Sequence, residues 1–237
     1  MKKILLYLLL ILCIVGNSSF SGSPDPQPIL DSLKIKFTRV KDYSADVNIK
    51  VNVSFIKVPV KEGKIYFKQP DKIKLESKGF AMIPKKGMGW GMQELFSKSY
   101  NAIYVKNETL QQKNLSVIKV LPIDENADIL LATLWIDRKT SLLHKAEMVT
   151  RNSGKSIIQF QYPAVANPYE LPSSLTFTFD VNKSTLPIGI TGEFDAEKKE
   201  KDDGKPKKAT LTIQYKNYVV NKGIPDAFFI EKNKASK

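Results

Sequence analysis

Few side chains in this sequence belong to the types that commonly catalyse reactions or bind metals. The chain has one histidine, His144, and one cysteine, Cys13, so neither a histidine-rich nor a cysteine-based metal site is expected. Gly154-Lys155-Ser156 resembles the end of a phosphate-binding loop, but Val149 occupies the position where that motif requires its first glycine. No GxSxG motif of a serine hydrolase occurs, and the acidic residues fall in turns and on polar strand faces. We therefore expect no enzymatic activity, no metal and no cofactor.

The N-terminal residues have the order of features that defines a secretory signal peptide. Two lysines precede the apolar run Ile4–Val15, and mostly small residues follow it, with Ser19 and Ser21 placed as at a cleavage site. The run is shorter than a membrane-spanning helix needs, and the bulky Leu12 before Cys13 argues against lipid attachment to that cysteine. The sequence therefore predicts a signal peptide over residues 1–21, cleavage near Ser21 and a periplasmic product without disulfides. An uncleaved membrane anchor and a lipoprotein signal are the alternatives.

Basic residues outnumber acidic ones, with 37 Lys and Arg against 24 Asp and Glu and a net charge of +13. In an exported protein this excess favours anionic lipid or envelope surfaces as partners, and not nucleic acid. Much of the excess lies in the run Lys198–Lys208, which has the composition of a solvated loop. Solubility is therefore the simpler explanation of the charge.

The rest of the chain, residues 22–237, predicts one mainly β domain. Apolar residues recur at helical spacing between Ile29 and Val40, which predicts an N-terminal amphipathic helix. Apolar and polar residues then alternate strictly from Val47 to Phe55, which is typical of an antiparallel strand with one buried face. Further strands are expected over residues 65–67, 73–75, 102–105, 116–121, 130–137, 142–150, 156–162, 175–181, 188–195 and 209–220. Because no helix long enough for a parallel crossover separates them, we expect a curled antiparallel sheet of about eleven strands, forming an incomplete, half-open barrel.

The inward-facing apolar positions of the first strands are the candidates for a lipid-binding cavity. They are Val47, Ile49, Val51, Val53, Phe55, Ile65, Phe67, Ile73 and Leu75. A short helix from Gln93 to Tyr100 and the segment Gly79–Met92 are expected to cover them as a lid, because glycine and proline prevent regular structure there and methionine suits an adaptable apolar surface. The lid candidates are Phe80, Met82, Ile83, Met88, Trp90 and Met92, and the head-group candidates are Lys85 and Lys86. The alternative is a fixed plug at one end of the barrel.

Several segments match a known superfamily in their order and spacing. Asp42–Asp46 opens the first long strand, and Gly63–Leu75 forms a strand–proline–strand hairpin. Leu134–Thr140 forms a later hairpin, and Ile157–Tyr162 and Leu171-Pro172 follow it. In this order the chain resembles the LolA/LolB-like superfamily of periplasmic lipoprotein carriers and related lipid-binding proteins. The resemblance implies an incomplete antiparallel barrel in which helices close one side around an apolar cavity.

The same resemblance implies a function in the cell envelope. It implies a monomeric, non-enzymatic protein that binds the acyl chains of lipids or lipoproteins, with envelope membrane proteins as further candidate partners and no nucleic-acid partner. Such a protein would carry lipoproteins or another lipid across the periplasm to the outer membrane. The alternative is an RseB-like envelope-stress sensor or a protein-interaction module.

Overall fold

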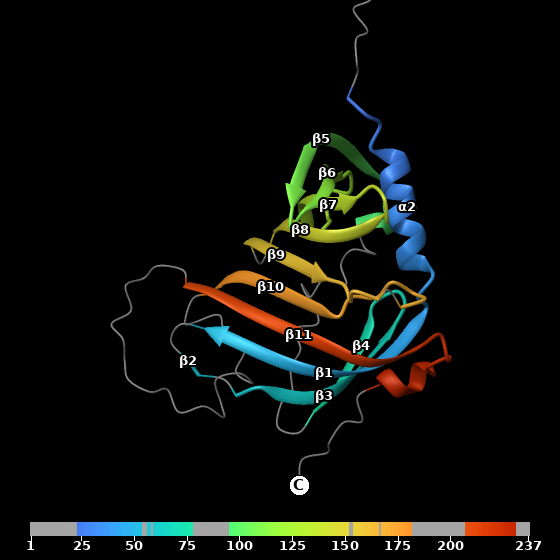
Figure 1. Ribbon diagram of the computed structural model, residues 1–237, viewed down its shortest axis with the longest axis vertical. Helices are drawn as coiled ribbons and strands as arrows, with labels where there is room; N and C mark the ends of the chain where they lie inside the picture. Colours follow the sequence, from blue (N-terminus) through green and yellow to red (C-terminus); the bar gives the residue numbers. More distant parts are fainter. Residues whose placement is uncertain are drawn as a thin grey trace, which may run out of the picture.

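The computed structural model of the protein describes residues 23–53, 56–57, 59–77, 95–151, 154–165, 167–181 and 207–230. The predicted signal peptide, the segment Gly79–Met92 and the strand predicted over residues 188–195 lie outside these residues. The described part of the chain is mainly β, with an N-terminal helix (Figure 1).

Within the described residues, eleven strands pair antiparallel and form one sheet. They are β1 (Asp42–Val53), β2 (Ile56–Lys57), β3 (Lys61–Lys68), β4 (Lys72–Ser77), β5 (Tyr100–Leu110), β6 (Lys113–Pro122), β7 (Ile129–Asp137), β8 (Leu142–Thr150), β9 (Gly154–Gln161), β10 (Ser174–Val181) and β11 (Lys207–Val220). Their order in the sheet is β4-β3-β1-β11-β10-β9-β8-β7-β6-β5, with β2 paired to β1. No pairing joins β4 to β5 among the described residues, so the predicted half-open antiparallel sheet is confirmed.

The pairing of β1 with β11 shows how the alternating sequence builds the core. Every second residue of β1 from Val47 to Val53 is buried, while the residues between them are more exposed. Each of these apolar residues faces another buried residue on β11. The pairs are Val47–Tyr215, Ile49–Ile213, Val51–Leu211 and Val53–Ala209. A register shift of one residue would turn the whole apolar set towards water, so burial specifies this pairing.

The predicted N-terminal helix is α2 (Gln27–Thr38), which begins directly after Pro26. Proline suits the start of a helix because it lacks an N–H group, and the first N–H groups of a helix have no partner inside it. Leu30 and Leu33 are buried in the core, and the helix contacts β8. Figure 1 shows α2, in blue, running along one side of the curled sheet. No helix in the described ranges is long and apolar enough to cross a membrane.

The strand predicted over residues 102–105 is longer in the structure, where β5 runs from Tyr100 to Leu110. The additional residues towards its end are mainly polar and exposed, so they lack the burial pattern by which a strand is recognised. They continue the strand because their backbone groups pair with β6, with a β-bulge near Lys106.

The described part of the helix predicted over residues 93–100 covers residues 95–97. Leu95 and Phe96 are buried in the core, as predicted. The helix ends before Tyr100, because that residue already pairs with β6 as the first residue of β5. The last element among the described residues is the short helix η1 (Asp226–Phe229).

A buried polar cluster joins the start of β1 to the end of β11. Asp42 is only 6% exposed, and its carboxylate accepts hydrogen bonds from the backbone N–H groups of Lys222 (3.0 Å) and Gly223 (3.1 Å). The Asn221 side-chain amide donates a hydrogen bond to the carbonyl oxygen of Arg39 (2.9 Å). These contacts hold the last strand against the junction between α2 and β1.

Candidate functional site

A cavity with a volume of about 110 Å³ lies between α2 and the inner face of the sheet. Its walls come from α2, from the loop between β9 and β10, and from six strands of the sheet. The lining residues are Leu33, Lys36, Phe37, Val40, Tyr43, Phe67, Leu142, Leu143, Phe160, Tyr162, Tyr169, Glu170, Leu171, Pro172, Leu175, Tyr215 and Tyr218. A concave site with mostly apolar and aromatic walls and few polar groups is suited to an apolar ligand.

The strand walls of the cavity follow from the alternation of side chains along each strand. Phe160 on β9 and Leu175 on β10 are direct cross-strand partners, and both are buried on the inner face. Leu33 and Phe37, one helical turn apart on α2, supply the opposite wall. The helix therefore covers apolar surface that the sheet alone would expose.

Two tyrosines reach the cavity from β11 because this strand contains an irregularity. Tyr215 and Tyr218 are three positions apart and would face opposite sides of a regular strand. Asn217, between them, has a φ of 53°, and the pairing of β11 with β1 shifts register at this point. Both rings therefore line the cavity, and they are stacked with their centroids 5.5 Å apart.

The buried tyrosines make the cavity polar at a few points without giving it a charge. The Tyr162 hydroxyl donates a hydrogen bond to the carbonyl oxygen of Leu143, and the Tyr218 hydroxyl donates to that of Pro172, each at 2.9 Å. Burial raises the pKa of Tyr162, Tyr215 and Tyr218 well above the ordinary tyrosine value. These groups are therefore neutral hydrogen-bonding side chains at physiological pH.

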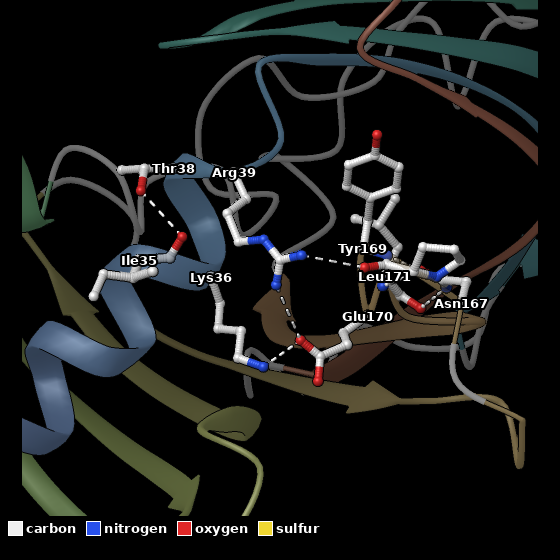
Figure 2. A network of polar contacts seen from close by, with 9 residues as sticks. Ile35, Lys36, Thr38, Arg39, Asn167, Tyr169, Glu170 and Leu171 are labelled. Carbon is white, nitrogen blue, oxygen red and sulfur yellow. Dashed lines mark hydrogen bonds and ion pairs between the residues drawn. The ribbon is translucent and has the colours of Figure 1, made fainter.

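Charged side chains gather at the rim of the cavity, where α2 meets the loop between β9 and β10. Figure 2 shows the Glu170 carboxylate between Lys36 and Arg39. It forms an ion pair with Lys36 and lies 3.8 Å from the nearer Arg39 nitrogen. Arg39 also donates a hydrogen bond to the carbonyl oxygen of Pro168 (3.4 Å). The side chains of Lys36 and Glu170 are 26% and 23% exposed, so the rim reaches solvent.

The loop that carries Glu170 is held by its own hydrogen bonds. The Asn167 side-chain oxygen accepts hydrogen bonds from the backbone N–H groups of Tyr169 (3.1 Å) and Leu171 (2.9 Å). Its side-chain amide donates to the Leu171 carbonyl oxygen at 2.9 Å, and Glu170 has a φ of 53°. A side chain that bonds backbone groups in this way fixes a tight turn. The loop therefore presents Glu170 to α2 in a defined position.

Among the predicted cavity residues that the structure describes, Phe67 lines this cavity. The others belong to the hydrophobic core. Val47, Ile49, Val51, Val53 and Ile65 are buried there, and Ile73 and Leu75 pack against it while partly exposed. A core position and a cavity wall share the same inward-facing apolar pattern, so alternation alone does not separate them.

The remaining predicted site residues lie outside the described residues. They are Phe55, the lid candidates Phe80, Met82, Ile83, Met88, Trp90 and Met92, and the head-group candidates Lys85 and Lys86.

Sequence reasoning missed the tyrosines and the charged rim. The two prolines that flank Glu170 mark a loop, and Lys36 falls on the predicted helix. Nothing in the sequence shows that the two meet, because they are 134 positions apart. Tyr215 and Tyr218 were not predicted to share a face, because residues three positions apart point to opposite sides of a regular strand.

The single histidine is placed beside the cavity wall. His144 on β8 is 8% exposed, and its ring lies edge-on to that of Tyr162 with the centroids 5.4 Å apart. Its Nε2 is 3.5 Å from the Lys113 ammonium group. Burial, together with the charge of Lys113, lowers the pKa of His144. Among the described residues, no three side chains are grouped as a metal site would require.

The lowered pKa of His144 predicts a pH-dependent contribution to stability. In the unfolded chain the His144 imidazole takes up a proton near pH 6.5, whereas in the folded protein it takes up the proton only at a lower pH. The contribution of a neutral His144 is therefore complete above that pH and is lost as the pH falls below it. Urea unfolding between pH 7.5 and 5 should show a steeper loss of stability for the natural protein than for His144→Phe, which keeps the ring contact. Equal slopes for the two proteins would contradict the assignment.

No family model matches this sequence, and no curated protein matches it. Solved structures do match the fold, each with a TM-score of 0.54. A LolA superfamily protein from Nitrosomonas europaea is 11% identical, over 88% of this chain and 98% of that one. A domain from Vibrio parahaemolyticus, named as a candidate outer membrane lipoprotein-sorting protein, is 9% identical over 86% and 97% of the two chains. A DUF1329 family protein from Desulfovibrio piger is 10% identical over 87% and 98%.

These similarities define the class of structure to which the protein belongs. Almost the whole length of each matched chain is covered, so the likeness concerns the complete fold and not one hairpin. The protein has a LolA-like fold, as the sequence resemblance implies. At these identities the likeness establishes the fold alone.

Proposed function

We propose that the protein binds lipid acyl chains in the cavity beneath α2 and carries a lipoprotein or another lipid across the periplasm to the outer membrane. The observation that carries this proposal is the cavity itself, whose walls are apolar and aromatic and whose charged rim reaches solvent at Lys36 and Glu170. Such a site buries an apolar chain and leaves a polar head group in water. The similarity to a LolA superfamily protein supports the same function.

The volume of the cavity limits the length of acyl chain that it can hold without rearrangement. An apolar cavity of about 150 Å³ holds one benzene molecule, and this cavity measures about 110 Å³. It therefore takes a short part of an acyl chain, and a longer part requires α2 to move away from the sheet. The apolar face of α2 would then pack on the ligand.

The polar contacts of the rim are weak enough to allow this movement. Ion pairs that reach solvent contribute about 0–1 kcal/mol, and the Lys36–Glu170 pair is of this kind. Each methylene group that leaves water contributes about 0.8 kcal/mol. Burial of a few methylene groups therefore offsets the loss of the rim contacts.

The proposal includes the location and the form of the protein. We propose that residues 1–21 are a signal peptide, that residues 22–237 act as one domain in the periplasm, and that the protein functions as a monomer without catalysing a reaction. The positive net charge of +13 supports contact with anionic lipid surfaces.

The expected result is that an acylated lipid co-purifies with the protein. Mass spectrometry of protein released gently from the envelope fraction should detect it, and N-terminal sequencing should begin near residue 22. An apolar fluorescent probe should bind the delipidated protein at one saturable site, from which the extracted lipid displaces it. Absence of both a bound lipid and a saturable site would contradict the proposal. The sensor or protein-interaction alternative would then be the better explanation of the fold.

A further inference from the structure

One polar group in the cavity wall has no partner. The Tyr215 hydroxyl makes no hydrogen bond within the described part of the chain, although Tyr215 is only 6% exposed and lines the cavity. Buried hydroxyl groups are nearly always hydrogen-bonded, because an unpaired one has lost its water without compensation. A ligand that supplies a partner would recover this loss.

The neighbouring tyrosines leave this hydroxyl available. The Tyr218 hydroxyl already donates to the carbonyl oxygen of Pro172, and its ring is stacked on the ring of Tyr215. The hydroxyls of Tyr43 and Tyr215 also approach each other. Burial raises the pKa of both groups, and this contact raises the pKa of Tyr43 further and lowers that of Tyr215, as expected when Tyr43 is on the donor side. The pair does not meet the geometry of a hydrogen bond, and with Tyr43 on the donor side the proton of Tyr215 is not used in this contact. The donor of Tyr215 is therefore uncommitted.

We propose that Tyr215 donates a hydrogen bond to a carbonyl oxygen of the bound ligand, so that the cavity selects acyl esters and amides over plain hydrocarbon chains. This specificity rests on the proposed lipid-binding function. A tyrosine hydroxyl can donate to an ester, amide or carboxyl oxygen, whereas a methylene group offers no acceptor. The carbonyl marks the point where an acyl chain joins the rest of a lipid, so the contact would also set how deep the chain lies.

A trapped water molecule is the competing partner for Tyr215. The cavity has room for water, which needs only a few polar partners to remain bound. A water molecule would satisfy the hydroxyl for every ligand alike. A preference for carbonyl-bearing ligands would therefore separate the two explanations.

The test compares two ligands that differ in one group. Methyl laurate and a chain-matched alkane, both delivered from cyclodextrin, compete with an apolar fluorescent probe for the delipidated protein. The natural protein should bind the ester about fivefold more tightly than the alkane, the usual effect of one neutral hydrogen bond. Tyr215→Phe should bind both ligands equally, at the affinity of the natural protein for the alkane. The infrared carbonyl stretch of bound, ¹³C-labelled ester should move to higher frequency in this variant.

Tyr218→Phe is the matched control. It removes a hydroxyl from the adjacent ring but leaves the Tyr215 donor in place, so the preference for the ester should persist. It should also lower the melting temperature, because the carbonyl oxygen of Pro172 loses its partner, whereas Tyr215→Phe should leave the melting temperature unchanged or raise it. Equal binding of ester and alkane by the natural protein would overturn the proposal and leave lipid binding intact. Binding of neither ligand would instead overturn the proposed function.

Discussion

Replacing Leu175 by tryptophan is expected to weaken the binding of an acyl-chain ligand by roughly 100-fold. Leu175 is buried on β10, and its side chain lines the cavity, so an indole ring at this position occupies the space that the ligand needs. Displacing about four methylene groups, at about 0.8 kcal/mol each, forfeits about 3 kcal/mol of binding free energy. Titration with an apolar fluorescent probe measures the change.

Thr178→Trp is the matched control for this experiment. Thr178 lies on the same strand, but it alternates with the buried Phe177 and therefore faces the outer side of the sheet. The same ring added there should leave the affinity within about twofold, because it does not enter the cavity. Thermal melts of both variants account for the cost of overpacking, typically about 1–3 kcal/mol. A folded Leu175→Trp protein that binds lipid normally would place the lipid site elsewhere.

Replacing Asp42 by alanine is expected to lower the free energy of unfolding by about 2–4 kcal/mol. The Asp42 carboxylate is buried and accepts hydrogen bonds from the backbone N–H groups of Lys222 and Gly223. Hydrogen bonds to a charged group each contribute about 1.5–3 kcal/mol, and the alanine variant leaves two backbone donors without their partner. The loss should be seen as a lower urea midpoint at an unchanged slope.

Asp46→Ala provides the comparison on the same strand. Asp46 accepts one hydrogen bond, from the side-chain amide of Asn217 in an exposed position (2.8 Å). Its removal should cost less than about 1 kcal/mol. If both variants were destabilised equally, the carboxylate of Asp42 would not be the feature that joins the start of β1 to the end of β11.

The regular elements could be predicted because their signals are local. β8 begins at Leu142 and ends at Thr150, as its alternation predicts, and the apolar stripe from Ile29 to Val40 forms α2 together with the turn that follows it. Both periods describe side chains a few residues apart, which is the distance over which a sequence pattern has structural meaning. β5 was underestimated because polar strand residues give no such signal.

The sequence predicted that an apolar cavity exists on the inner face of the sheet, but not which residues line it. Alternation correctly placed Val47, Ile49 and Ile65 on the inner face, and the structure buries them in the core. Which inner positions fill the core and which border a space depends on how far the sheet curls and where α2 packs. Those are properties of the assembled layers, and a strand pattern does not contain them.

The amino-acid sequence by itself determined the class of this protein: a mainly β chain whose curled antiparallel sheet has one apolar face and an N-terminal helix to cover it. Only the tertiary structure decided which polar side chains meet at the candidate site. It brings Lys36 to Glu170 across 134 positions. It also turns Tyr215 and Tyr218 to the same side of β11 through the backbone at Asn217. The first depends on a contact between distant segments, and the second depends on a local break in strand periodicity. Neither produces a repeating pattern in the sequence.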